Sequence, residues 1–307
     1  MTFFNSIKLL GSNWEKVLKL FLYYLIVWGI TICLLLPVFF EFSDIISSNI
    51  KNTDVVASYT TVFSANFGSY LNSLLLLVYK VFLDCVAANL GLVIYGLIVL
   101  FIIMPFLLNI GKYVTCDMLY GYMASKSHVG FFSSLFKTLN KSLLFSLFKT
   151  LYSLLFLALT TYLVFVIGFI NDSFFQTYFL ALCEIILLVV LFTLNKVTTT
   201  GWAPAVIVFG CSVFAGYVRG TKVVVRRFWR TLLVGLLIFL IFFLVTFIAG
   251  VYSLVVTVPI VAALLCMYDM TTFFTSQGMR FYVNNSTILT PKKLEEVDNI
   301  NKARYII

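Results

Sequence analysis

Residues 105–151 read PFLLNIGKYVTCDMLYGYMASKSHVGFFSSLFKTLNKSLLFSLFKTL, and a shortened copy of this pattern returns at residues 204–232 as PAVIVFGCSVFAGYVRGTKVVVRRFWRTL. Both copies space a proline and two glycines identically, with Pro105, Gly111 and Gly121 in the first and Pro204, Gly210 and Gly220 in the second. Each copy leaves one apolar run, crosses a basic amphipathic segment and enters another apolar run. Few other identities accompany the repeat, but the matched spacing predicts that these prolines and glycines are structural turning points in two related halves.

The composition is that of a membrane protein. Hydrophobic residues make up 62% of the chain, charged residues 11%, and the mean hydropathy is +1.07. Soluble domains are roughly half apolar and about a quarter charged. Runs such as residues 232–244 do not alternate in polarity, as the strands of a membrane barrel do. The sequence therefore predicts an all-α, polytopic membrane helical bundle.

Apolar runs long enough to cross a bilayer predict six transmembrane helices. They cover residues 17–40, 86–110, 144–170, 174–194, 231–250 and 253–272. Residues 3–19 have the pattern of an interfacial amphipathic helix that continues into the first span. Residues 202–217 are short and Gly-rich, and three interpretations stay open for them: a span, a re-entrant segment or a surface helix.

The polar regions divide the rest of the chain. Residues 41–73 form a polar loop between spans, followed by a predicted surface helix over residues 70–83. We expect a membrane domain at residues 1–280 and a polar C-terminal tail at residues 281–307.

The basic residues predict the orientation. With the N-terminus placed inside, 19 of the 21 Lys and Arg residues lie on the cytoplasmic side. Positive charge is retained on that side, so both termini are predicted to be cytoplasmic. The net charge of +9 then reflects contact with anionic lipid headgroups rather than nucleic acid. The residues expected to make these contacts are Arg219, Lys222, Arg226, Arg227 and Arg230.

Four polar residues are candidates for a solute or ion path: Glu184, Asn109, Asp117 and Asp269. Glu184 stands mid-way along the predicted fourth span, where a charge costs roughly 2.5–3.5 kcal/mol on insertion scales. It fits either an ion path or a protonated, hydrogen-bonded helix clamp. Lys112 near Asp117 fits either a pair or a solvated helix end, and Asp269 could reach the arginine group.

The sequence gives little support for a metal site, a cofactor or an enzymatic activity. The six cysteines form no CxxC motif and His128 is the only histidine, so we predict no metal site and no cofactor. No paired carboxylates, Ser/His pair or phosphate-binding glycine loop is present, so the chain is not expected to be an enzyme.

The pattern Pro105-x5-Gly111, followed by Thr115, Tyr120, Phe131-Phe132 and Phe136-Lys137, resembles the YesL family of small bacterial integral membrane proteins. The longer loop at residues 41–73 and the polar tail depart from that family's pattern. The resemblance implies a bacterial inner-membrane protein with an accessory role in carbohydrate uptake, and it brings no binding residues with it. The first function hypothesis is therefore a permease or the accessory of one. The alternative is a scaffold that assembles with another membrane protein subunit.

Overall fold

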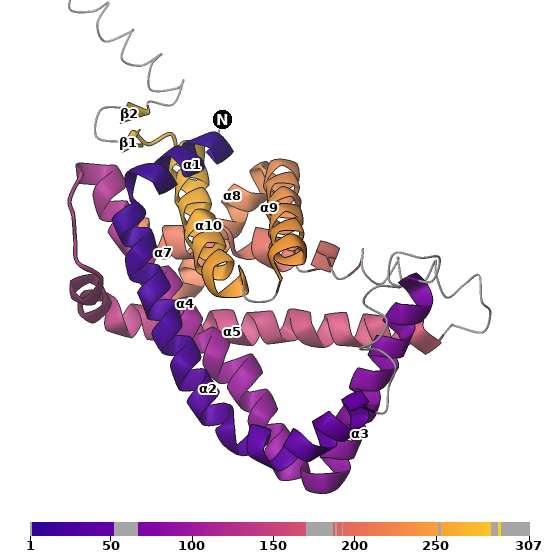
Figure 1. Cartoon of the computed structure of the whole chain (residues 1–307). Helices are drawn as coiled ribbons and strands as arrows, with labels where there is room; N and C mark the ends of the chain where they lie inside the picture. Colours follow the sequence, from indigo (N-terminus) through magenta and orange to yellow (C-terminus); the bar gives the residue numbers. More distant parts are fainter. Residues whose placement is uncertain are drawn as a thin grey trace, which may run out of the picture. The chain divides into compact units, whose positions relative to one another are not determined.

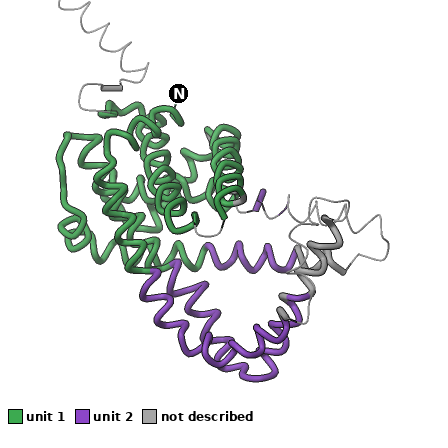
Figure 2. The backbone as a smooth tube through the Cα atoms, viewed as in Figure 1, with its two compact units in different colours: residues 1–27, 106–152, 193–307 green, residues 28–105, 153–192 purple. Residues whose placement is uncertain are grey.

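The computed structural model describes residues 2–51, 67–169, 187, 189–191, 193–250, 253–283 and 288–289. The chain divides into two compact units (Figure 2). Unit 1 contains residues 1–27, 106–152 and 193–307, and unit 2 contains residues 28–105 and 153–192. The boundaries after residues 27, 105 and 152 fall inside helices, and each unit is built from pieces that are distant in sequence.

Almost all of the described chain is helical (Figure 1). The helices are α1 (Thr2–Ser12), α2 (Trp14–Lys51), α3 (Phe67–Ile98), α4 (Met104–Ser125), α5 (Phe131–Phe169), α7 (Trp202–Phe209), α8 (Val213–Arg226), α9 (Phe228–Ala249) and α10 (Leu254–Gln277). A π-helical segment, Val99–Ile103, joins α3 to α4, and residues 193–199 form a further helical stretch. The strands β1 (Phe281–Tyr282) and β2 (Ile288–Leu289) pair antiparallel in a region that the sequence predicted only as a polar tail.

Five described helices are long and apolar enough to cross a membrane. They are Trp14–Asn49, Tyr79–Ser125, Phe131–Leu163, Phe228–Thr246 and Leu254–Gln277. They contain or closely match the predicted first, second, third, fifth and sixth spans, whereas the fourth falls mostly on residues outside the described ranges. Large apolar side chains such as Leu233, Leu240 and Ile248 of α9 are exposed, as is expected where a helix faces lipid. The chain is a multi-pass helical membrane protein.

The N-terminal region differs from its prediction because the helix breaks at Asn13. The buried Asn13 side chain donates from Nδ2 to the carbonyl of Leu9 at 3.0 Å, and it accepts from Lys16 Nζ at 2.7 Å. Asn side chains compete in this way with the backbone bonds of a helix interior. Helix α1 is therefore separate from α2, and it packs on α10, where Ser6 Oγ lies 2.8 Å from Thr271 Oγ1.

The first copy of the repeat does not turn where its proline and first glycine were expected to turn it. Pro105 and Gly111 both lie inside α4, and only Gly121 lies near the helix end, where its carbonyl accepts from Ser127 N at 3.2 Å. Proline removes a backbone donor, and the π-helical segment before Pro105 is a known way to accommodate such a defect without ending a helix. Gly111 provides close approach instead, since a Cβ there would lie 2.5 Å from Cε1 of Tyr23.

The second copy does turn. Gly210 follows α7 in the left-handed conformation, with φ 61°, and Ser212 caps α8 by accepting from Ala215 N at 3.4 Å. Pro204 sits in the first turn of α7, where a missing N–H is harmless. Gly220 lies inside α8 rather than at a turn. Residues 202–217 thus form parts of two helices, of which α7, with 8 residues, is too short to span a bilayer.

In unit 2 the later part of α2 packs against α3. Phe42, Cys85 and Val93 form the centre of this contact. Asn49 Nδ2 donates to Asp84 Oδ2 at 2.9 Å. The predicted surface helix at residues 70–83 is instead part of α3, which continues toward the second span.

Candidate functional site

Unit 1 contains a buried ion pair between Lys196 and Asp269. Lys196 lies in the helical stretch 193–199 and Asp269 lies on α10, and Lys196 Nζ donates to Asp269 Oδ2 at 2.6 Å. The two side chains are only 21% and 9% exposed. Burial acts to lower the pKa of Lys196, but the charge of Asp269 and the hydrogen bond outweigh it and place the pKa above the ordinary value. Lys196 is therefore charged at neutral pH.

The ion pair engages only one of the two carboxylate oxygens of Asp269. Its second oxygen, Oδ1, is buried and accepts no hydrogen bond from the described part of the protein. A buried carboxylate oxygen without a donor is expensive, because it has lost water and gained nothing in return. A further donor or a proton is needed at this position.

Two more lysines surround the pair. Lys112 on α4 and Lys149 on α5 are half-buried and interact electrostatically with both Lys196 and Asp269. Asp269 is the carboxylate that acts on each of them most strongly. Lys149 Nζ also lies 5.4 Å from the centre of the Phe145 ring, which attracts a cation. The group thus holds three lysine side chains against one carboxylate.

Helical spacing explains why these side chains share one place. Asn109, Lys112 and Cys116 follow one another at intervals of three and four residues, so they occupy one face of α4. Cys266 lies almost one turn before Asp269 on α10, and its sulfur is 3.8 Å from the carbonyl of Lys112. Cys116 and Cys266 are buried, free thiols whose side chains hydrogen-bond to each other.

Aromatic rings form another wall. Phe145, Lys149 and Tyr152 lie on one face of α5, and the ring centre of Trp202 is 5.4 Å from that of Phe145 and 4.8 Å from that of Tyr217. Trp202 Nε1 donates to the carbonyl of Val213 at 2.8 Å, which fixes the indole. Burial and a hydrogen bond with Tyr152 raise the pKa of Tyr217 to about 12, so this phenol stays neutral. We call Lys112, Lys149, Lys196 and Asp269 the lysine cluster. The rings of Phe145, Tyr152, Trp202 and Tyr217 are its aromatic wall.

The predicted site residues are only partly brought together. Asp269 belongs to the lysine cluster, but its partner is Lys196 rather than the arginine group. Asn109 lies on the same face of α4 as Lys112 and donates from Nδ2 to Thr150 Oγ1 at 3.3 Å. Glu184 lies outside the described residues.

Asp117 does not pair with Lys112. It accepts a hydrogen bond from Ser134 Oγ at 2.6 Å, while Lys112 turns toward the cluster. The interpretation of Lys112 as a solvated helix end was also wrong, since the side chain is half-buried. Residue spacing explains why the two do not pair: the positions are five residues apart, which places them on different faces of α4.

Sequence reasoning missed Lys149 and Lys196. Both stand at the ends of apolar runs, where lysine is usually a solvated, interfacial residue. The one available signal was the helical spacing of Phe145, Lys149 and Tyr152, which places the lysine among aromatic residues on one helix face.

The lysine cluster offers anion-binding rather than metal-binding groups. In the described residues no three His, Cys, Asp or Glu side chains converge in a way that suits a metal ion. No family model matches this chain, and no curated protein or solved structure is significantly similar to it.

Proposed function

We propose that this membrane protein is transport-related, and that the lysine cluster is where a small anionic solute binds on its way through unit 1. The observation that carries the proposal is that three lysines, Lys112, Lys149 and Lys196, gather around one carboxylate, Asp269. Ammonium groups removed from water need a compensating charge, and without one they cost several kcal/mol each. An anion between them would supply it.

The geometry of the Lys196–Asp269 pair supports a binding role rather than a purely structural one. A structural pair is most stable when both carboxylate oxygens are hydrogen-bonded, yet Asp269 Oδ1 accepts no bond within the described ranges. A protonated oxygen of a bound solute could donate to it. The same carboxylate would then hold Lys196 in place and orient the solute.

The broken helix next to the cluster also supports transport. Helices α7 and α8 are short and separated at Gly210, and Trp202 of α7 forms part of the aromatic wall. Transporters commonly build their binding sites from short, Gly- or Pro-interrupted helices. We further propose that both termini are cytoplasmic and that the chain is a distant member of the YesL-like membrane proteins, on the charge distribution and motifs given above.

Flux measurements in proteoliposomes test the proposal. Uptake of radiolabelled phosphate, acetate and chloride is compared with uptake of neutral glucose, for the wild type, K112M, K149M and the control K8M, which changes an exposed lysine of α1. We expect uptake of at least one anion, lost in K112M and K149M and kept in K8M. Glucose uptake that is unchanged in K112M and K149M would overturn the proposal of an anionic solute. No flux of any solute, together with co-purification of a second membrane protein, would favour the scaffold hypothesis.

A further inference from the structure

Helix α8 presents three faces, of which one packs against the described part of the protein. The packed face contains Gly216 and Gly220, which contact α7 so closely that a Cβ on Gly220 would lie 2.6 Å from the carbonyl carbon of Gly201. A second face is apolar and exposed, with Phe214 at 71% and Val225 at 76% exposure. The third face is basic.

The basic and apolar exposed faces lie side by side. Arg219 and Lys222 are three residues apart and share the basic face. The segment Val213–Arg226 contains no acidic residue. An exposed apolar stripe beside a basic one is the pattern of a helix that lies in the membrane interface, with apolar side chains about 5–10 Å deep and basic ones at the phosphate level.

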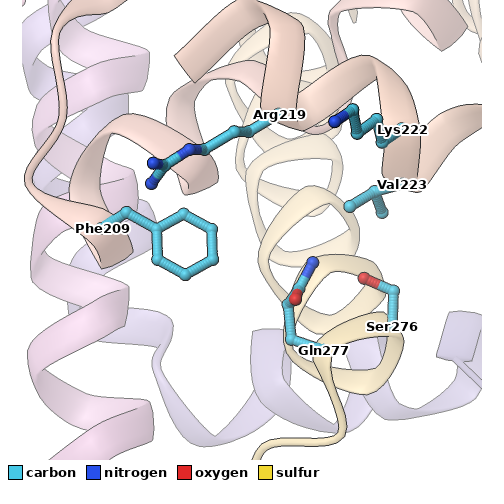
Figure 3. A pocket seen from close by; sticks show the side chains of 6 residues that line it. All are labelled: Phe209, Arg219, Lys222, Val223, Ser276 and Gln277. Atoms are coloured by element: carbon cyan, nitrogen blue, oxygen red, sulfur yellow. The ribbon is translucent and has the colours of Figure 1, made fainter. Parts of the chain in front are cut away.

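A pocket opens beside this basic face (Figure 3). It has a volume of about 360 Å³ and is lined by Phe209, Arg219, Lys222, Val223, Ser276 and Gln277. The Arg219 guanidinium extends over the ring of Phe209, with its central carbon 5.1 Å from the ring centre. Ser276 and Gln277 come from the last turn of α10 on the other side of the pocket. Among the described residues, no carboxylate lines it.

These groups suit a phosphate. Guanidinium binds phosphate oxygens through two parallel hydrogen bonds, lysine adds a point charge, and the hydroxyl and amide can donate further bonds. The C-terminus of α10 carries a partial negative charge, which would repel an anion. This partial charge is only about half a unit, whereas Arg219 and Lys222 supply two full positive charges. The apolar surfaces of Phe209 and Val223 would accommodate the glycerol and first methylenes of a lipid.

We propose that this pocket binds the phosphate of an anionic phospholipid, with the acyl chains lying along Phe214, Val218 and Val225. The exposed apolar stripe selects a lipid over a free phosphate ion, because only a lipid brings acyl chains to cover it. The site is distinct from the lysine cluster and does not depend on the proposed solute. It would anchor α8 and, through the Gly201–Gly220 contact, hold α7 against the rest of unit 1.

The test uses the full chain in a neutral detergent, titrated with short-chain phosphatidylglycerol, short-chain phosphatidylcholine and inorganic phosphate while its melting temperature is recorded. The key variant is R219Q/K222Q. The matched control is K8Q/K137Q, which removes the same charge from two exposed lysines outside the pocket. R219K, which keeps the charge but loses the paired hydrogen bonds, is a graded third variant.

We expect phosphatidylglycerol to raise the melting temperature of the wild type and of the control alike. R219Q/K222Q should weaken the apparent affinity at least about tenfold, and R219K by a smaller factor, since bonds to charged groups are lost. If K8Q/K137Q weakened the apparent affinity for phosphatidylglycerol equally, the attraction would be a diffuse effect of charge. That result would overturn the pocket as the binding site. Inorganic phosphate that stabilises as well as phosphatidylglycerol would overturn the lipid and leave a free-phosphate site. Equal binding of phosphatidylcholine would overturn selection by net charge.

Discussion

Residues 105–151 and 204–232 share the spacing of one proline and two glycines, yet the first copy continues as a helix through Pro105 and Gly111 while the second ends a helix at Gly210. The difference lies in the residues that follow the first glycine. In the second copy Gly210 is followed by Ser212, whose side chain caps the next helix, whereas Lys112 and Tyr113 follow Gly111 and offer no cap. A glycine permits a turn, and a capping residue stabilises the new helix.

The two copies also differ in where their basic residues lie. The first copy carries Lys112 and Lys149 into the interior of unit 1, beside Asp269. The second copy leaves Arg219 and Lys222 exposed beside a pocket. Substitutions in the buried set should therefore change stability strongly and with either sign, whereas those in the exposed set should leave it nearly unchanged.

The largest effect is expected for D269N. It leaves Lys196 without its buried carboxylate partner, and breaking a buried ion pair from one side costs about 3–5 kcal/mol. Denaturant or thermal unfolding in detergent would measure it. The control is D117N, which weakens a half-buried hydrogen bond from Ser134 and should cost about 1 kcal/mol. Adding K196M to D269N should recover part of the loss. Equal costs for D269N and D117N would contradict the cluster.

A second difference between the copies is expected at their glycines. G220A places a Cβ 2.6 Å from backbone atoms of Gly201, which cannot move aside, so we expect destabilisation of about 1–3 kcal/mol. G111A meets a ring carbon of Tyr23 at 2.5 Å, and a side chain can shift, so its cost should be smaller. In α2, G29A meets no atom within 4 Å and should be neutral or stabilising. A cost for G111A above that of G220A would reverse this assignment.

A third prediction concerns whether the removal of a lysine from the lysine cluster lowers or raises stability. K112M removes a half-buried positive charge from a group that already has too many, so stability should stay equal or rise by about 1 kcal/mol. Anion flux should nevertheless be lost. Thermal unfolding and proteoliposome flux measured on the same preparation give the two readouts, with K137M, at an exposed lysine, as the control. A clear loss of stability in K112M would mean that the lysine is structurally compensated.

The sequence predicts the parts of the fold that depend on hydrophobicity alone. Five of the six predicted spans match long apolar helices, because the length of an apolar run follows directly from the thickness of a bilayer. The break at Asn13 and the continuous helix through Pro105 depend on single side-chain and backbone hydrogen bonds, which composition does not report. Three interpretations stay open from sequence for residues 202–217 for a related reason, since the turn between α7 and α8 depends on Gly210 and on the cap at Ser212.

The candidate site was less predictable still. Asp269 and Asn109 stood out because they are polar residues in or beside apolar runs. Lys149 and Lys196 did not, since lysines at the ends of such runs usually reach water. Their burial comes from the packing of α4, α5, α10 and residues 193–199 on one another, and the distances between those elements are a tertiary property.

The smallest effect on stability is expected for R219Q/K222Q in lipid-free detergent. Both side chains are exposed, and the described residues place no carboxylate within ion-pairing distance of either. Surface substitutions of this kind usually change stability by less than about 0.5 kcal/mol. Thermal unfolding without added lipid checks this, with D269N in the same series as the contrasting case. A large loss in the double variant would mean that Arg219 supports the fold through its contact with Phe209, and then the two copies would differ less than their burial indicates.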